Sequence, residues 1–207
     1  MKSKAHTELK KFDDELRLKY GRYIAGIDEC GRGSLAGPLV AACVVLDERQ
    51  ILEGVNDSKK LSQKRREELY ERIITSCISY GIAEISSEEI DKIGIQQANF
   101  TAMINAANLA IKHIDELPHL YVIDQGPKNN LKPQLMIPKA DSTSLAVAAA
   151  SIIAKVHHDN VLAKIHEEYP EYDLINNKGY ITASHKDAIA KYGLQNFHRK
   201  SYQINVR

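Results

Sequence analysis

An uninterrupted run of apolar residues, Leu39 to Leu46, most constrains the fold of this chain. The run is far shorter than the roughly 18 residues that a membrane-spanning helix needs. Pro38 stands directly before it. A short apolar run with such a flank is typical of a buried β-strand. The chain is therefore expected to fold around a sheet that has this segment in its interior.

Other short apolar segments alternate with longer stretches at helical spacing. The further predicted strands are Tyr23–Ile27, Ile82–Ile85, Leu120–Ile123 and Gln134–Ile137. Helices are predicted around Leu9–Leu16, from Ser62 to about Tyr80 with Gly81 as its stop, after the capping box Ser86–Glu89, over Gln96–His113, over Ser142–Glu168 and over Thr182–Tyr192. Helices that intervene between strands favour an α/β fold with a mixed sheet.

Composition bounds the class of protein. The chain has 207 residues, which is enough for one α/β domain that carries a helical appendage. Hydrophobic residues make up 43% and charged residues 27%, as in an ordinary folded domain. The net charge is only +1, whereas indiscriminate nucleic-acid binding needs a basic footprint. Any nucleic-acid function must therefore rely on local basic clusters.

The sequence also predicts a compartment. The first twenty residues lack the apolar core of a signal peptide. The three cysteines, Cys30, Cys43 and Cys77, form no C-x-x-C pair and leave an odd count. Reduced thiols in a cytoplasm fit this usage. We therefore expect a cytoplasmic chain without a membrane partner.

Four acidic residues stand apart from the solvated helix faces that hold most of the others. Asp28 and Glu29 end the first strand, Asp124 ends a later strand, and Asp141 begins a helix. Strand ends in α/β folds can aim side chains into one crevice, where converging carboxylates repel each other unless a cation joins them. Oxygen ligands select Mg²⁺ or Mn²⁺, and two such ions can clamp a phosphodiester.

Each carboxylate also has a purely structural interpretation. Asp141 alone fits a helix N-cap. Asp124 precedes Gln125-Gly126-Pro127 and fits a turn starter. The adjacent pair Asp28-Glu29 after an apolar strand is less easily explained in this way. Spacing alone leaves the metal site and the structural roles open.

A glycine-rich turn follows the first strand. Its Gly31-x-Gly33-x-x-Ala36 pattern fits the relaxed dinucleotide fingerprint, which must open a helix. Here Pro38 and a strand-like segment follow, so we reject a dinucleotide site. The glycines instead indicate a loop whose backbone approaches a ligand closely. Arg32 between them offers a guanidinium to a phosphate.

Basic residues form three local clusters, although such clusters are usually solvated faces. The first cluster is Lys59, Lys60, Lys64, Arg65 and Arg66, the second is Lys178, His185 and Lys186, and the third is His198, Arg199 and Lys200. Tyr180 lies beside the second cluster, which is compatible with stacking on a sugar or a base.

Taken in order, these motifs closely resemble the bacterial ribonuclease HII family. The matching stretches are Ala25–Gly33, Leu35–Pro38, Asn56–Ser62, Glu89–Asp91, Val122–Asp124, Ala140–Ser142, Ala148–Val156, Asn177–Tyr180 and His198–Ser201. They run from about Tyr23 to Tyr202, which is nearly the whole chain. Some are weak individually, but in this order they are highly specific.

The resemblance implies an α/β, ribonuclease-H-like fold with a mixed central sheet flanked by helices and a C-terminal helical extension. It implies one domain over residues 1–207, with an N-terminal helix over about 1–20, a catalytic core over about 23–168 and a substrate-binding extension over about 169–207. The implied enzyme is an endoribonuclease that hydrolyses the RNA strand of RNA–DNA hybrids. It would also incise at ribonucleotides embedded in duplex DNA, leaving a 5′-phosphomonoester.

The resemblance also implies roles for individual residues. Asp28, Glu29, Asp124 and Asp141 would be the catalytic metal ligands for Mg²⁺ or Mn²⁺, with two ions during catalysis, and they are the four residues isolated above. The implied substrate contacts are Gly31, Arg32, Gly33, Lys59 and Tyr180. The ring of Tyr180 would pack on the sugar next to the ribonucleotide, where a 2′-OH would clash. We expect a monomer with nucleic-acid partners and see no clamp-binding motif in the tail.

The chain departs from the family pattern at a few positions. Cys30 stands where the family has a small aliphatic residue, and we interpret it as a packing residue. Gln125 separates Asp124 from Gly126, where the family commonly has Asp-Gly.

Two other functions are open alternatives. A different two-metal nuclease on the same fold would share the carboxylates but not the glycine-arginine-glycine loop or Tyr180. A non-catalytic nucleic-acid-binding module would have no need for the four carboxylates together.

Overall fold

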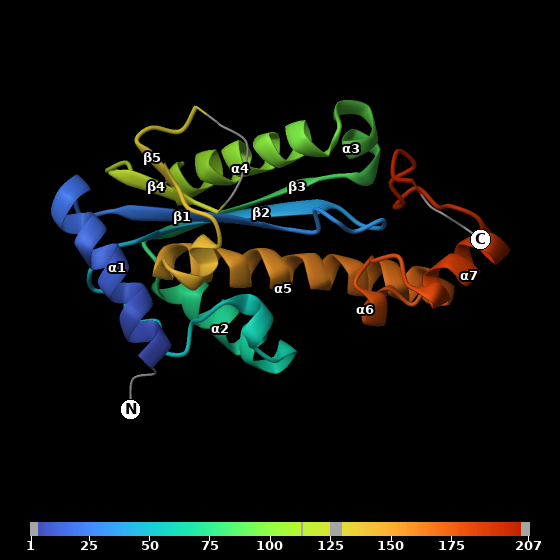
Figure 1. The fold of residues 1–207 in the computed structure, drawn as a ribbon, viewed down its shortest axis with the longest axis horizontal. Coiled ribbons are helices and arrows are strands. Elements are labelled where there is room, and N and C mark those ends of the chain that lie inside the picture. Colours follow the sequence, from blue (N-terminus) through green and yellow to red (C-terminus); the bar gives the residue numbers. More distant parts are fainter. Residues whose placement is uncertain (1–3, 113, 125–129, 204–207) are drawn as a thin grey trace.

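The computed structural model describes residues 4–112, 114–124 and 130–203, and these form one mixed five-stranded sheet with helices on both faces (Figure 1). The strands are β1 (Ile24–Cys30), β2 (Leu39–Leu46), β3 (Ser79–Ile85), β4 (Leu120–Ile123) and β5 (Gln134–Met136). The α-helices are α1 (Lys4–Tyr20), α2 (Gln63–Ser76), α3 (Ser87–Ile93), α4 (Ile95–Ile111), α5 (Leu145–Glu168), α6 (Leu174–Asn177) and α7 (Ala183–Tyr192). The short 3₁₀ helices are η1 (Ser58–Lys60), η2 (Ala140–Ser142) and η3 (Pro170–Tyr172). The predicted α/β class with a mixed sheet is confirmed.

The strand order of the sheet is β3-β2-β1-β4-β5. β2 runs antiparallel to β1 and β3, whereas β1, β4 and β5 run parallel to one another. Ile27 of β1 pairs with Ile123 of β4. The next residue of each strand, Asp28 and Asp124, therefore comes to the same part of the sheet.

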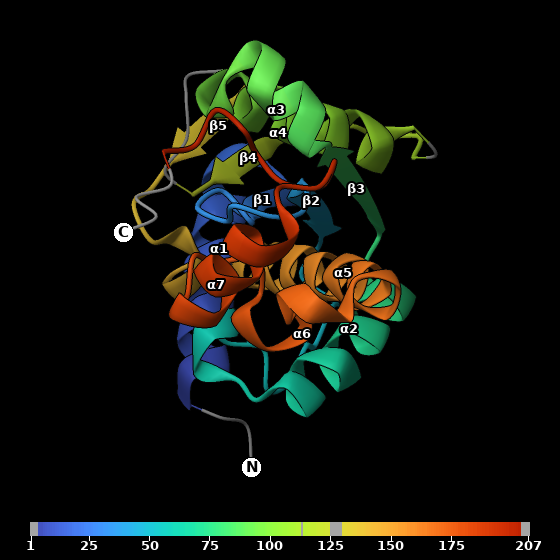
Figure 2. The same ribbon diagram turned by 90° about the vertical axis from the view of Figure 1, so that its right-hand side faces the viewer.

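β2 is buried along its whole length, as its apolar sequence predicts. Alternate side chains of a strand point to opposite faces, so one half of β2 joins each side of the core. Val40, Val44 and their neighbours pack with α5, and Leu39, Val45 and theirs pack with α4. α3 and α4 lie over one face, while α5 covers the other with α1 and α2 packed beyond it (Figures 1 and 2).

α5 is more deeply buried than its sequence suggested. A helix at the surface of a domain has one apolar face, but here every residue from Leu145 to Ala154 is buried. The reason is that α5 packs against β1 and β2 on one side and against α1 and α2 on others. A helix enclosed in this way must be apolar or small on all sides.

The helix predicted from Ser62 to about Tyr80 is wrong at its end. Ser62 caps α2 as predicted, because its side chain accepts from the Arg65 amide. However, α2 ends at Ser76, and Tyr80 is already in β3, paired with β2. Gly81 is not a helix stop, because it lies within β3. It is a glycine because a side chain at this position would collide with the backbone of α4. Strand pairing with β2 therefore overrides the helical pattern.

Most other boundaries agree with the sequence. Ser86 caps α3, while Thr182 and Gly193 bound α7 as predicted. The helix predicted to begin at Ser142 instead begins after Ser144, whose side chain accepts from the amide of Val147. None of the helices in the described ranges has the length and apolarity to cross a bilayer.

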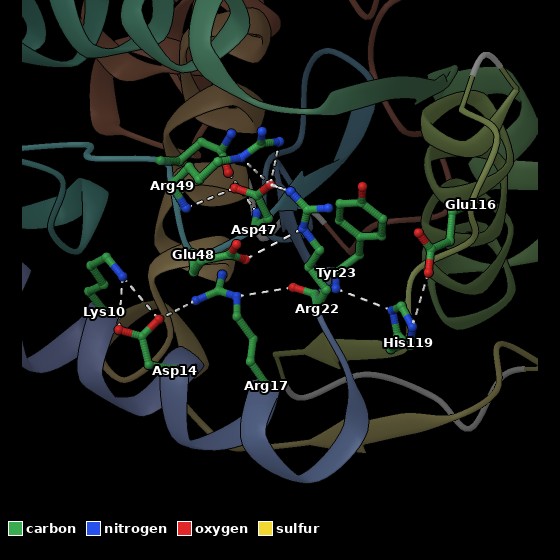
Figure 3. A network of polar contacts seen from close by, with 11 residues as sticks. Lys10, Asp14, Arg17, Arg22, Tyr23, Asp47, Glu48, Arg49, Glu116 and His119 are labelled. Atoms are coloured by element: carbon green, nitrogen blue, oxygen red, sulfur yellow. Dashed lines mark hydrogen bonds and ion pairs between the residues drawn. The ribbon is translucent and has the colours of Figure 1, made fainter.

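A polar network fixes the starts of β1 and β4 (Figure 3). The buried carboxylate of Asp47, directly after β2, accepts hydrogen bonds from the guanidinium groups of Arg22 and Arg49. The Tyr23 amide donates to Nδ1 of His119 over 3.2 Å, and the His119 amide donates to the Tyr23 carbonyl over 2.8 Å. These contacts hold the two parallel strands in register, which in turn sets the relative positions of their far ends.

The segment after α5 returns to the loop between β1 and β2 (Figure 2). This segment contains η3, α6, α7 and the residues up to 203. It packs with the loop and with α5 in a separate small core that includes Leu35, Leu162, Tyr172 and Phe197. Ala36 of the loop forms a β-bridge with His198. The extension is thus attached to the glycine-rich turn.

Candidate active site

The sheet brings Asp28 and Asp124 side by side. Asp28 and Glu29 lie inside β1 rather than after it, and Asp124 directly follows β4. The Asp124 amide donates to the Ile27 carbonyl over 3.2 Å, which continues the parallel pairing. Oδ1 of Asp124 in turn accepts from the Ala140 amide over 3.2 Å, and this bond attaches η2 with Asp141. All four predicted carboxylates therefore lie in one region, and Asp141 does not cap α5.

Burial and mutual repulsion disfavour the charged forms of these carboxylates. Burial, followed by the charges of Glu29 and Asp124, raises the pKa of Asp28 well above its usual range. Burial and the charge of Asp124 raise the pKa of Glu29 to about 7, although Arg32 and Lys59 oppose the rise. The pKa of Asp141 is also raised, mainly by burial and by Asp57. Groups that repel in this way are typical of sites that bind a cation.

The site opens into a cavity of about 370 Å³. Its lining residues come from β1, η1, α2, α5, the end of β4 and the C-terminal extension, and they are Asp28, Glu29, Cys30, Ser58, Lys59, Arg66, Asp124, Ser151, Lys155 and Tyr180. Nζ of Lys59 lies 3.7 Å from Oδ2 of Asp141, so the lysine links the cavity to the fourth carboxylate. The predicted substrate residues Lys59 and Tyr180 thus share one cavity with three of the four acids.

The donor set of this region fits a hard divalent ion. Its charged ligands are carboxylate oxygens, which Mg²⁺ and Mn²⁺ prefer. Oε2 of Glu29 is buried and has no hydrogen-bond partner among the described residues. Within residues 4–112, 114–124 and 130–203, however, no three Asp, Glu, His or Cys side chains are close enough to form a complete metal-binding group. Gln125, which follows Asp124, lies outside the described residues.

The glycine-rich turn lies next to the carboxylates. Gly31 directly follows β1 with a φ of 88°, and His158 and the Pro38 carbonyl occupy the space where its Cβ would be. Gly33 has no such restriction, since a methyl group there would only reach van der Waals distance, 3.6 Å, from the Tyr180 ring. Of Gly31 and Gly33, only Gly31 therefore needs to be glycine for conformational reasons. The next element is β2, an antiparallel partner of β1, so the helix that the dinucleotide fingerprint requires does not begin at this turn.

Tyr180 is held against the turn by backbone hydrogen bonds. The Gly179 carbonyl accepts from the amides of Leu35 and Ala36, over 2.8 and 3.1 Å. The Tyr180 side chain is 51% exposed, so its ring can reach a ligand. The guanidinium of Arg32 is also half exposed, and Nη1 lies 3.9 Å from Oε1 of Glu29.

The residues of the three predicted basic clusters differ in their location and burial. In the first, Lys59 and Arg66 line the cavity. In the second, His185 is fully buried. The third is wrong as a surface cluster, because His198 and Arg199 are buried and only Lys200 is exposed. The sequence could not distinguish these cases, because the burial of these side chains depends on contacts that form only in the folded chain.

Sequence reasoning also missed residues of the cavity. Ser58 and Ser151 share a hydrogen bond of 2.8 Å between their hydroxyl groups. The Ser151 side chain also faces Asp28 and acts to lower the pKa of that carboxyl group. Lys155 follows one helical turn after Ser151 and pairs with Asp159 over 2.8 Å. Ser151 and Lys155 are four residues apart, so a helix places them on the same face. This spacing could have indicated a polar site, but the surrounding residues are mostly alanine and isoleucine and favoured a core helix.

Comparison with solved structures defines the class of fold. Ribonuclease H2 from Pyrococcus horikoshii OT3 matches with a TM-score of 0.73 at 27% identity, over 87% of this chain and 94% of that one. The ribonuclease HII in a complex with PCNA from Archaeoglobus fulgidus matches with a TM-score of 0.71 at 29% identity, over 88% and 96%. Bst ribonuclease HIII, solved in complex with Mn²⁺, shares the fold at 20% identity and a TM-score of 0.74, over 89% of this chain and 68% of that one. The protein therefore has a ribonuclease-H-like fold.

Sequence comparison identifies the family within this class. The family "Ribonuclease HII" matches residues 25–205. The ribonuclease HII proteins of Caldicellulosiruptor saccharolyticus and Clostridioides difficile are each 43% identical over 196 residues. The matches cover 93% of this chain and 93% of the first relative, and 94% of this chain and 75% of the second. The chain belongs to the ribonuclease HII family, as its motifs indicated, and is an endoribonuclease of the ribonuclease H type that acts on RNA–DNA hybrids.

Proposed function

We propose that this ribonuclease H also incises duplex DNA at single embedded ribonucleotides, and that two divalent ions assist the hydrolysis. The observation that supports this most is the composition of one cavity. It combines the carboxylates Asp28, Glu29 and Asp124 with cationic side chains and with Tyr180, which lies against the glycine-rich turn. Hydrolysis and ribose recognition would therefore take place next to each other.

Asp28, Glu29, Asp124 and Asp141 would hold the ions. When bound, Mg²⁺ or Mn²⁺ would activate a water molecule and stabilise the leaving oxygen, leaving a 5′-phosphomonoester. Asp28 would be the central ligand, because its charge interacts with those of both Glu29 and Asp124 and it is 7% exposed. The raised pKa values of Asp28 and Glu29 indicate that their negative charges are costly in this position and that a cation would relieve the cost.

The basic residues of the cavity would bind the phosphate backbone. Lys59 is exposed on η1, while Arg66 and Lys155 are anchored by Asp159 at 3.8 and 2.8 Å. Anchored cations lose less conformational freedom when they bind a phosphate. Phosphate contacts position a nucleic acid but do not distinguish RNA from DNA. Recognition of ribose must therefore come from elsewhere in the site.

The turn and Tyr180 would supply that recognition. The 2′-OH is the feature that separates ribose from deoxyribose, and it can both donate and accept a hydrogen bond. Backbone groups of Gly31, Arg32 and Gly33 can approach it, because Gly33 has no side chain. The exposed ring of Tyr180 would pack on the neighbouring deoxyribose, where a second 2′-OH would clash. Together they would detect an RNA-to-DNA step.

A gel assay tests this function directly. The substrate is duplex DNA with one ribonucleotide, incubated with Mg²⁺, Mn²⁺ or EDTA, with an all-DNA duplex as the control. We expect cleavage at the ribonucleotide with either metal and none with EDTA or with the all-DNA duplex. Cleavage of long hybrids without cleavage of the single-ribonucleotide duplex would contradict the proposal. Equal cleavage of all-DNA duplex would favour the alternative of a different two-metal nuclease, and binding that survives EDTA without any cleavage would favour a binding module.

The remaining expectations concern assembly. A monomer without a clamp-binding motif stays a prediction, and the last residues, 204–207, lie outside the described ones. The same holds for the division into an N-terminal helix, a catalytic core and a substrate-binding extension.

A further inference from the structure

The buried residues His198 and Arg199 connect the C-terminal segment to both parts of the proposed ribose-recognition site. They are neighbours in the chain, and their exposed fractions are 1% and 0%. Both were expected on a basic surface, so their burial needs an explanation. The Arg199 side chain hydrogen-bonds to the glycine-rich turn, and the His198 side chain is connected through His185 to Tyr180. Both the turn and Tyr180 are proposed to contact the substrate.

Arg199 binds the backbone of the glycine-rich turn. Its Nη2 and Nε atoms donate to the Gly37 carbonyl over 3.0 and 3.3 Å, and Nη1 donates to the Arg32 carbonyl over 3.1 Å. The Tyr202 hydroxyl donates to the same Arg32 carbonyl over 2.8 Å and accepts from Nη1. The guanidinium thus bridges two points of the turn, one of them between Gly31 and Gly33.

This is an unusual use of a buried cation. A buried charge is costly unless it is paired and fully hydrogen-bonded. In the described part of the chain, the hydrogen-bond partners of the Arg199 side chain are carbonyl and phenol oxygens, with no carboxylate among them. A planar fork carries donors on three separate nitrogens and so can reach two carbonyls of fixed position, whereas the donors of an ammonium group all radiate from one nitrogen. Such a residue fixes the shape of the turn.

His198 leads to Tyr180 through a second histidine. The Gln195 amide donates to Nδ1 of His198 over 2.9 Å, and Nε2 of His198 lies 3.1 Å from Nε2 of His185. Nδ1 of His185 lies 2.9 Å from the Tyr180 carbonyl. Both rings are buried, and His198 packs against the ring of Tyr172.

The partners of this relay fix the proton on each ring. A carbonyl can only accept, so Nδ1 of His185 carries a hydrogen and its Nε2 is an acceptor. A backbone amide can only donate, so Nδ1 of His198 is an acceptor and its Nε2 carries the hydrogen. His198 therefore donates to His185, and His185 donates to Tyr180. A further proton on either ring would place two donors face to face, so the relay requires both rings to be neutral.

We propose that His198 and Arg199 are positioning residues for ribose recognition: Arg199 shapes the glycine-rich turn, and His198 acts through His185 to place Tyr180. The inference rests on the proposed roles of the turn and of Tyr180. It predicts different defects for the two residues. Loss of the relay should affect the single-ribonucleotide duplex, whereas loss of Arg199 should affect every ribose-containing substrate.

The relay is tested with two variants of His185 and two substrates. His185→Leu removes both side-chain hydrogen bonds, while His185→Asn keeps a donor near the Tyr180 carbonyl. We expect His185→Leu to lower kcat/KM about tenfold on the single-ribonucleotide duplex and less than about threefold on a long hybrid. His185→Asn should recover most of the loss. Equal losses on both substrates, or a loss that His185→Asn does not recover, would overturn the relay.

A Tyr180→Ala background separates this inference from the proposed function. The relay binds the Tyr180 carbonyl, so this variant keeps the relay and removes only the ring. If the relay acts through the ring, His185→Leu should cause no further loss of junction cleavage in that background. A normal rate for Tyr180→Ala alone would refute the role of the ring in the proposed function. A slow Tyr180→Ala with a normal His185→Leu would refute the relay alone.

Arg199 is tested with Arg199→Lys, which keeps the charge but replaces the planar fork with a single nitrogen. The matched control is Lys191→Gln, which removes an exposed charge on α7. We expect Arg199→Lys to lower kcat/KM about tenfold on both ribose-containing substrates and Lys191→Gln to leave it unchanged. A normal rate for folded Arg199→Lys would overturn this part of the proposal.

Ring ¹⁵N chemical shifts provide a readout on the wild-type protein and do not depend on whether a variant folds. At neutral pH, we expect His185 to be protonated on Nδ1 and His198 on Nε2. A charged ring, or the same tautomer in both, would overturn the relay.

Discussion

The carboxylate region and the recognition region are built in opposite ways. Asp28, Glu29 and Asp124 lie on or directly after adjacent parallel strands, so the register of the sheet sets their positions. The glycine-rich turn lies outside the sheet and accepts hydrogen bonds from Arg199, which is more than 160 residues further along the chain. Tyr180 also lies outside the sheet and is held by the turn through Gly179 and by His185. The first region depends on the core of the fold, and the second depends on buried polar contacts. Changes to one should therefore leave the other intact.

The largest effect should come from the carboxylate region. Asp28→Asn keeps the shape of the side chain and removes its charge. We expect it to lower the single-turnover rate by at least about 10²–10³-fold on every substrate, because electrostatic contributions of this kind carry several kcal/mol. Circular dichroism and thermal unfolding should show an intact fold. Near-normal turnover would contradict the assignment of Asp28 as the central ligand.

Substitutions of Gly31 and Gly33 in the turn should have different effects. Gly31→Ala would force a φ near 88° on alanine and drive a methyl group into His158 and the Pro38 carbonyl, so we expect a loss of stability of about 1–3 kcal/mol. Gly33→Ala meets the Tyr180 ring only at ordinary contact distance, so it should fold normally and lose activity on all ribose-containing substrates. Thermal unfolding and cleavage rates separate the two. If Gly33→Ala is fully active, the turn does not approach the ribose as proposed.

Acid should weaken the recognition region in particular. Burial, followed by the neighbouring His185, lowers the pKa of His198 to about 4 from an ordinary value of 6.5. As the pH falls from 6.5 towards 4, the unfolded chain takes up a proton that the folded chain resists, so the stability contributed by His198 is lost in this window. The expected loss is roughly 1–3 kcal/mol. His198→Gln should show a smaller dependence of the melting temperature on pH between 7 and 5; an unchanged dependence would mean that His198 is not the responsible group.

The smallest effect is expected at Cys30. Burial raises the pKa of its thiol to about 12, so the thiol stays protonated although it lines the cavity. Cys30→Val should therefore stay active, and any sensitivity to thiol reagents or soft metals should decrease. Residual activity after treatment with a thiol reagent, compared between the two proteins, provides the test. A loss of activity in Cys30→Val would reveal a role for the thiol.

The contrast between the two regions also explains what the sequence could predict. The apolar run Leu39–Leu46 identified a buried strand because burial on both faces leaves a strong pattern. Asp28, Glu29 and Asp124 were identifiable because they follow or interrupt apolar strands, and Asp141 because it begins a helix. The end of α2 was not, because Tyr80 and Gly81 pair with β2, which is distant in the sequence.

The buried histidines and arginine were harder still to predict. The sequence of the basic triplet His198-Arg199-Lys200 does not indicate whether its side chains are exposed or buried. Only the carbonyls of Arg32 and Gly37, and the ring of His185, distinguish the two cases, and their proximity arises from the folded chain. The resemblance to ribonuclease HII marked these residues as part of a motif but did not indicate burial.

One comparison tests most directly the claim that hydrolysis and ribose recognition are separate. It is the ratio of kcat/KM for the single-ribonucleotide duplex to kcat/KM for a long RNA–DNA hybrid, measured for wild type, Asp28→Asn and Tyr180→Ala. Asp28→Asn should lower both rates and leave the ratio unchanged. Tyr180→Ala should lower the ratio about 10- to 100-fold, since the stacking of one ring contributes on the order of 1–3 kcal/mol. An unchanged ratio in folded, metal-binding Tyr180→Ala would contradict the separation.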